Sequence, residues 1–160
     1  GVGAGASIPG HFHFQFFHRA PDFPSFPIEE RDFTTAKNGE DPGFIVDYPI
    51  KVLLWQGDLE KVVENAVSWI SKWIKSKIEL SELLSTNFIA TASLARDEIT
   101  LYFVPRDKSK QFWNGNRGIV GGLEVLGELV MASEDELALI EKGIVNYQFI
   151  EKALSTVSMR

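Results

Sequence analysis

Histidine and phenylalanine alternate near the start of the chain, in the stretch Gly10-His11-Phe12-His13-Phe14-Gln15-Phe16-Phe17. In an extended strand, successive side chains point to opposite faces, so both histidines and Gln15 share one face and three phenylalanines share the other. A helix has 3.6 residues per turn and would scatter the same histidines around its axis. The alternation therefore predicts a β-strand over residues 10–17, with one polar face and one apolar face that is suited to a core.

Small residues precede this predicted strand, because residues 1–10 read Gly-Val-Gly-Ala-Gly-Ala-Ser-Ile-Pro-Gly. A backbone with such small side chains lets a ligand approach closely, and its N–H groups can bind a phosphate. A neutral imidazole is a good nucleophile near neutral pH when a hydrogen bond orients its other nitrogen. The whole N-terminal stretch therefore indicates a place where a phosphate group is bound and attacked.

The pattern His11-x-His13-x-Gln15 resembles the His-x-His-x-Gln signature of the transferase branch of the histidine triad (HIT) superfamily. This branch includes galactose-1-phosphate uridylyltransferase, diadenosine tetraphosphate phosphorylase and the GDP-hexose phosphorylases. The aromatic residues within the motif make it most similar to the GDP-hexose phosphorylases. The resemblance implies that His13 attacks the α-phosphorus of a nucleotide and carries a covalent nucleotidyl group. We expect His11 to position or contact the phosphate.

The resemblance also implies that Gly5 and Ser7, in the lead-in to the motif, contact the phosphate. One feature departs from the family pattern. Ser7 is separated from His11 by Ile8, Pro9 and Gly10, one residue more than in the Ser-x-Pro-His spacing common in this branch. The extra residue would place Ser7 differently relative to the phosphate from the corresponding serine of the family.

Gln15 bears on the type of reaction, because a neutral amide cannot act as a general acid or base. Glutamine in place of a third histidine favours keeping the phosphoramidate for a second acceptor, so we expect a transferase or phosphorylase and not a hydrolase. The donor would be a nucleoside diphosphate sugar or a dinucleoside polyphosphate, and the acceptor would be inorganic phosphate or a sugar phosphate. The nucleophile requires no cofactor, and a structural or assisting divalent metal is left open.

Two other functions remain open for the same residues. His11, His13 and His18 lie within eight positions, so they could form a metal-binding module. Against this, the chain has no cysteine, and His18 falls on the opposite face of a regular strand from the other two histidines. The second alternative is a noncatalytic nucleotide-binding domain that has kept the motif.

A basic stretch follows a second predicted strand. Residues 98–105 alternate between two faces and pair with residues 87–93 in a predicted antiparallel hairpin. Four cations then follow within residues 106–118 of an acidic chain. We expect Arg106, Lys108 and Lys110 to bind the leaving or incoming phosphate, and an ordinary solvated loop is the alternative.

The remaining pattern predicts an α+β fold, a HIT-like and mainly antiparallel β-sheet flanked by helices. We expect further strands at residues 44–55 and 121–131. A helix should begin after Asp58, and helices should run from Ser133 to about Leu154. Residues 19–43 contain four prolines and are expected to form an extended crossing segment. Residues 1–160 are interpreted as a single HIT-like domain, the C-terminal part of a longer protein.

Composition excludes several classes of protein. A formal net charge of −6 argues against a nucleic-acid binder, and the chain lacks an apolar run long enough to cross a bilayer. The absence of cysteine excludes disulfides and fits a reducing compartment, so we expect a cytoplasmic protein. The sequence is also compatible with a homodimer.

Overall fold

The computed structural model describes residues 14–18, 20, 22–36, 38–77, 79, 84–93, 97–110, 112–114, 117–131 and 133–159. These residues form a five-stranded sheet, a separate two-stranded sheet and four α-helices. Every strand pair in both sheets is antiparallel. The predicted α+β fold with a mainly antiparallel sheet is therefore confirmed. None of the described helices combines the length and the apolar character needed to cross a membrane.

The five-stranded sheet has the order β1-β2-β3-β5-β4. Its strands are β1 (Phe33–Thr34), β2 (Gly43–Ile45), β3 (Leu53–Gly57), β4 (Leu84–Ser93) and β5 (Glu98–Asp107). Strands β4 and β5 form the predicted hairpin, and ten residues of each strand are paired. Strand β5 ends at Asp107, two residues later than the sequence predicted, so Arg106 belongs to the sheet. The smaller sheet contains β6 (Phe112–Asn114) and β7 (Arg117–Ile119).

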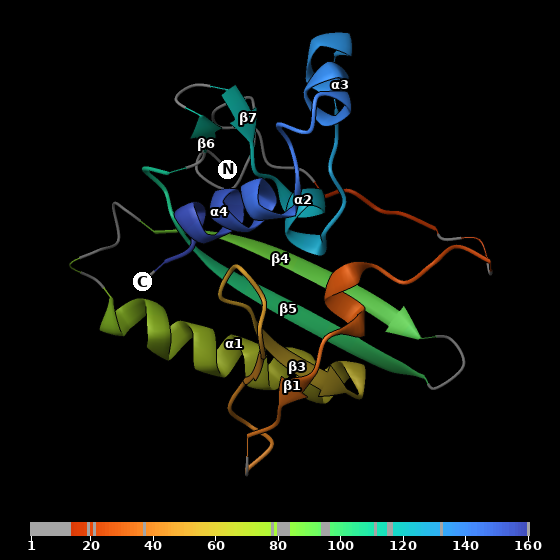
Figure 1. The fold of residues 1–160 in the computed structure, drawn as a ribbon. Helices are drawn as coiled ribbons and strands as arrows, with labels where there is room; N and C mark the ends of the chain where they lie inside the picture. The colour runs from red at the N-terminus through yellow and green to blue at the C-terminus, as the bar shows by residue number, and fades with distance from the viewer. Residues whose placement is uncertain are drawn as a thin grey trace.

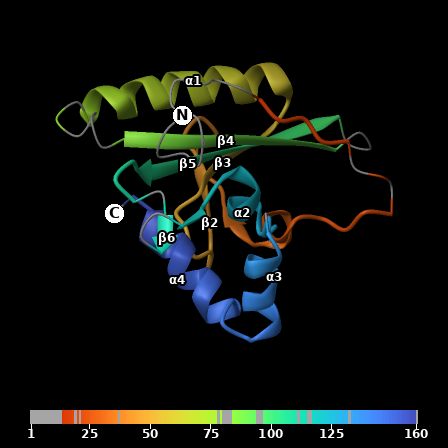
Figure 2. The ribbon, with the colours of Figure 1, turned by 90° about the horizontal axis from the view of Figure 1, so that it is seen from above.

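Helix α1 (Leu59–Ser76) covers one face of the large sheet (Figures 1 and 2). It begins as the sequence predicts, because the Asp58 carboxylate accepts hydrogen bonds from the backbone N–H groups of Glu60 and Lys61. Its inner side packs on alternate residues of β3 and β5. The buried residues of this layer are Leu53, Trp55, Val62, Ala66 and Phe103.

Further helical elements pack against the opposite face of the sheet, on the other side from α1 in Figure 2. These elements include the 3-10 helix η1 (Pro27–Glu30), α2 (Gly122–Leu126) and α4 (Tyr147–Val157). Helix α3 (Glu134–Glu141) has no buried residue. The core of this layer contains Ile28, Leu54, Tyr102, Val104, Val125, Leu126, Leu154 and Val157, among others.

Three predicted elements differ from the structure. The strand predicted over residues 44–55 is broken between β2 and β3, where Asp47 adopts a left-handed φ of 52° and Pro49 follows. The strand predicted over residues 121–131 is wrong, because its apolar part forms α2. The helical region after Ser133 is interrupted between α3 and α4, where Gly143 has a φ of 68°.

The Pro-rich segment predicted over residues 19–43 is less uniform than expected. It contains η1 and β1, and it reaches the first residue of β2. Phe26 is buried in the core, whereas Phe23 and Phe33 are exposed. Phe26 is therefore the one of the three phenylalanines in this segment that packs in the core.

Candidate functional site

The N-terminal motif lies largely outside the described residues, which exclude Gly5, Ser7, His11 and His13. Gln15 is described, and its side chain is exposed. Residues 14–18 are not in a strand, so the predicted strand is wrong over this part. Phe14 and Phe16 were expected to face the core, but they are 70% and 91% exposed. A strand needs a hydrogen-bonded neighbour, and the strand pairs of the described chain provide none for these residues.

Arg106 differs most from its predicted placement. It lies in β5 instead of a loop, and the whole residue is buried, with a relative exposure of 0%. Its Nη1 donates hydrogen bonds to Asn87 Oδ1 at 2.8 Å and to the Val120 carbonyl oxygen at 2.5 Å. The prediction of an accessible cluster of Arg106, Lys108 and Lys110 is therefore corrected. In this structure Arg106 connects β5 to β4 and to the segment before α2.

The surroundings of Arg106 also change its pKa. Burial lowers the pKa of Arg106 to about 10, and the Glu124 carboxylate acts in the opposite direction. Its Nε and Nη2 are buried, and neither has a hydrogen-bond partner within the described residues. Burial of a guanidinium is costly, so the arginine depends closely on its hydrogen bonds to Asn87 and to the Val120 carbonyl oxygen.

The two lysines after β5 are on the surface. Lys108 is exposed, and Lys110 forms an ion pair with Asp107, in which Nζ lies 3.1 Å from Oδ2. Asp107 also accepts a hydrogen bond from the Ser109 hydroxyl at 2.6 Å. This hydrogen bond is the main reason that the pKa of Asp107 is lowered. Of the three predicted phosphate-binding cations, Lys108 remains exposed with no ion pair among the described residues.

Metal binding was the alternative function of the histidines. Within the described part of the chain, no three His, Cys, Asp or Glu side chains are grouped so that they could hold a metal ion. His18 belongs to that part and is exposed, whereas His11 and His13 do not belong to it. The metal-binding alternative therefore stays open.

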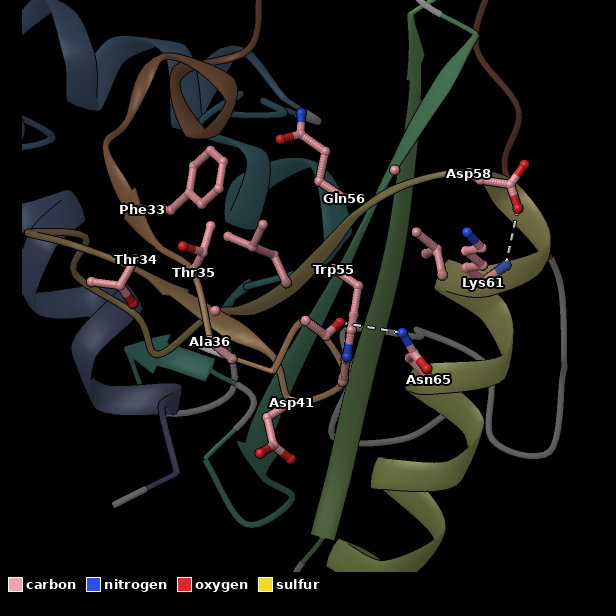
Figure 3. A pocket seen from close by; sticks show the side chains of 15 residues that line it. Phe33, Thr34, Thr35, Ala36, Asp41, Trp55, Gln56, Asp58, Lys61 and Asn65 are labelled. Carbon is pink, nitrogen blue, oxygen red and sulfur yellow. Dashed lines mark hydrogen bonds between the residues drawn. The ribbon is translucent and has the colours of Figure 1, made fainter.

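A cavity that sequence reasoning missed lies between the β1–β2 connection, the end of β3 and the start of α1 (Figure 3). Its volume is about 250 Å³. Among the side chains that line it are Trp55, Gln56, Lys61 and Asn65. At the start of α1, the backbone N–H groups of Glu60 and Lys61 already donate to the Asp58 carboxylate, so these two groups are not free to bind an anion. The lining residues come from two stretches of the chain, residues 33–43 and 54–65, and no sequence motif connects them.

Comparisons with models of protein families, with curated proteins and with solved structures find no match.

Proposed function

We propose that this protein is a nucleotidyltransferase that acts through a covalent nucleotidyl-histidine at His13. The donor is a nucleoside diphosphate sugar or a dinucleoside polyphosphate, and the acceptor is phosphate or a sugar phosphate. The observation that carries this proposal is the spacing His11-x-His13-x-Gln15 after a lead-in of small residues. The exposure of Gln15 supports it, since a residue that acts beside the transferred group must be accessible to ligand.

The proposed reaction with a nucleoside diphosphate sugar has two displacements. In the first, a neutral His13 nitrogen attacks the α-phosphorus, a P–N bond forms, and the bond from the α-phosphorus to the bridging oxygen breaks. The sugar 1-phosphate leaves with the electron pair of that bond. In the second, an oxygen of inorganic phosphate attacks the same phosphorus and the imidazole leaves, which regenerates His13 and releases a nucleoside diphosphate.

The proposal also assigns roles to the residues that would bind the transferred phosphate. His11 contacts the transferred phosphate and positions it, and Gly5 and Ser7 contribute to binding it. Lys108 is the cation best suited to this role, because it is exposed and has no ion pair among the described residues, whereas Lys110 is paired with Asp107 and Arg106 is buried. A cation beside the transferred group offsets charge that develops during the displacement.

The proposal is tested by incubating the full chain with a panel of nucleoside diphosphate sugars and dinucleoside polyphosphates, without acceptor. Intact-mass spectrometry should detect a single nucleotidyl adduct that disappears when phosphate is added. His13→Ala should abolish the adduct, and His18→Ala is the matched control that should retain it. Nucleotide binding without an adduct would support the noncatalytic alternative. Stoichiometric metal in the purified protein, lost in His13→Ala, would support the metal-binding alternative.

The role of Gln15 gives a separate prediction. Gln15→His adds a titratable group beside the phosphoramidate, so hydrolysis of the donor should rise relative to transfer. The measurement is the ratio of nucleoside monophosphate to nucleoside diphosphate formed at a fixed phosphate concentration. An unchanged ratio would mean that Gln15 does not protect the intermediate from water.

A further inference from the structure

A second cavity of about 360 Å³ lies along α1 and adjoins the cavity of Figure 3, because Asp41 and Asn65 line both. We call the two cavities together the α1 groove. The second cavity is formed by one side of α1 and the connection between β1 and β2. Its lining residues are Glu40, Asp41, Asn65, Ser68, Trp69, Lys72, Trp73 and Ser76.

Two tryptophans form an aromatic surface in the groove. Trp69 and Trp73 are half-buried, and their rings are nearly parallel, with an interplanar angle of 16° and centroids 6.3 Å apart. Edge contacts to Trp55, at 5.9 Å from Trp69, and to Phe103, at 5.3 Å from Trp73, hold the two rings from the core side. The exposed parts of both rings are therefore fixed in place before any ligand binds.

The wall opposite α1 is also fixed. The Asn38 side chain donates to Asp41 Oδ2 at 2.9 Å and accepts hydrogen bonds from the backbone N–H groups of Glu40 and Asp41. The Glu40 carbonyl oxygen accepts a hydrogen bond from Trp55 Nε1 at 3.0 Å. Asn65 Nδ2 donates to the Gly39 carbonyl oxygen at 3.2 Å, as Figure 3 shows. These bonds join the wall to both β3 and α1, so the groove is preformed.

A row of polar groups borders the tryptophans. Asn65, Ser68 and Lys72 have the spacing i, i+3 and i+7, which places them along one side of α1. Within the described part of the chain, Asn65 Oδ1, Ser68 Oγ and Lys72 Nζ make no hydrogen bond or ion pair. The carboxylates of Glu40 and Asp41 belong to the other wall. The groove thus offers donors and acceptors beside an aromatic surface.

We propose that the α1 groove binds a neutral carbohydrate ring. The C–H face of a sugar can pack on the tryptophans while its hydroxyl groups donate to carboxylates and accept from Lys72. Three acidic residues line the groove, Glu40, Asp41 and Asp58, and they disfavour an anion. Lys61 and Lys72 disfavour a cation, so the charges of the groove favour an uncharged ligand with many hydroxyl groups. The groove volume lies within the range of small-molecule sites. This inference does not depend on chemistry at His13.

The test is a titration of the full chain with D-glucose, D-galactose, D-mannose and maltose, followed by NMR of the tryptophan Nε1–H groups. Glycerol at equal mass corrects for bulk solvent effects. We expect at least one sugar to shift the resonances of Trp69 and Trp73 in a saturable manner. The double variant S68A/K72A should raise the dissociation constant at least fivefold. The double variant S71A/K75A removes the same residue types from exposed positions outside the groove, and its affinity should be unchanged.

Three results would overturn the proposal. The first is that no sugar produces a saturable shift. The second is that S68A/K72A and S71A/K75A bind the sugar with equal affinity although circular dichroism shows both to be folded. The third is that sodium phosphate or a quaternary ammonium salt, and no sugar, shifts the same resonances. None of these readouts depends on His13. Failure to detect the nucleotidyl adduct would therefore leave the carbohydrate proposal unaffected.

Discussion

Arg106 shows how strongly a single buried side chain can depend on its partners. Arg106→Ala should lower the free energy of unfolding by about 3 kcal/mol, because it leaves a cavity and removes the hydrogen bonds to Asn87 and to the Val120 carbonyl oxygen. Lys108 is exposed and lies two residues after Arg106. Lys108→Ala should therefore change the free energy of unfolding by less than about 0.5 kcal/mol. Urea denaturation of the two variants checks this. Equal, small effects would mean that Arg106 is not held in the core.

Tyr48 gives the fold a dependence on alkaline pH. Its hydroxyl donates to the Val125 carbonyl oxygen at 2.6 Å, and burial raises the pKa of Tyr48 to about 12 from an ordinary value of 10. The unfolded chain therefore loses this proton first. The stability from this group is complete below pH 10 and is lost as the pH rises towards 12.

Comparison of Tyr48→Phe with the parent protein isolates this contribution. Arg106 has a lowered pKa, so above pH 10 its titration changes stability with the opposite sign to that of Tyr48. Both the variant and the parent keep Arg106, so its effect cancels in the comparison. The variant should be less stable than the parent by about 1 kcal/mol at pH 8 through loss of the hydrogen bond. By pH 11 the difference should shrink by about 1 kcal/mol, because only the parent loses the Tyr48 contribution. Urea denaturation at both pH values provides the measurement. A difference that does not depend on pH would contradict the raised pKa.

Helix α2 is the element whose type was predicted wrongly, and glycine explains how it ends. Gly127 caps α2 with a left-handed φ of 101°, and a Cβ built there would lie 2.6 Å from Pro27 Cγ in η1. The Glu124 carboxylate accepts hydrogen bonds from the backbone N–H of Gly121 at 2.8 Å and of Val130 at 3.3 Å. At the other end, the Gly127 N–H donates to the carbonyl oxygens of Leu123 and Glu124, so backbone groups are satisfied at both ends of a helix that is only five residues long.

A pair of glycine variants tests this account of α2. Gly127→Ala should destabilise the protein by more than about 2 kcal/mol, because the new methyl group meets both a strained φ and the Pro27 ring. Gly122→Ala is the matched control, since it lies inside the helix and its Cβ would meet nothing within 4 Å. It should be neutral or stabilising by about 0.5 kcal/mol. Thermal unfolding of both variants measures the difference, and a similar melting temperature for the two would contradict the cap.

The whole molecule has two packed layers that share the same strands. Leu53, Trp55 and Phe103 face α1, whereas Leu54 and Tyr102 of the same strands face the opposite layer. Loss of either layer therefore exposes one face of β3 and β5. We expect one cooperative unfolding transition, with coincident midpoints by tryptophan fluorescence and by far-UV circular dichroism.

Leu154→Ala tests this coupling, because Leu154 is buried in α4 on the side of the sheet away from α1. The variant should lose about 3 kcal/mol and shift both transitions equally. Leu59→Ala, at an exposed position of α1, should shift neither by more than about 0.5 kcal/mol. A fluorescence transition that stays in place when Leu154 is replaced would show that the two layers unfold independently.

The local spacing of apolar residues was sufficient to predict the strands and helices with the clearest patterns. The alternation of Ile99, Leu101 and Phe103 predicted β5, and Asp58 with apolar residues at helical spacing predicted α1. These predictions were correct because the spacing of apolar side chains shows directly which residues of a strand or helix share a face. The same reasoning failed for residues 14–18, where alternation is present but none of the described strands is their neighbour.

Other features depended on contacts between distant segments. A short apolar run bounded by glycines fits either a strand or a helix, and the choice of α2 reflects contacts of Gly127 with η1 and of Glu124 with nearby backbone. Whether Arg106 is a surface cation or a buried link depended on Asn87 and Val120, which approach it only in the folded chain. The α1 groove has the same origin, because hydrogen bonds from Trp55 and Asn65 bring the β1–β2 connection against α1. These contacts between distant residues are determined by how the segments pack in the folded chain. The spacing of residues along the sequence does not predict them.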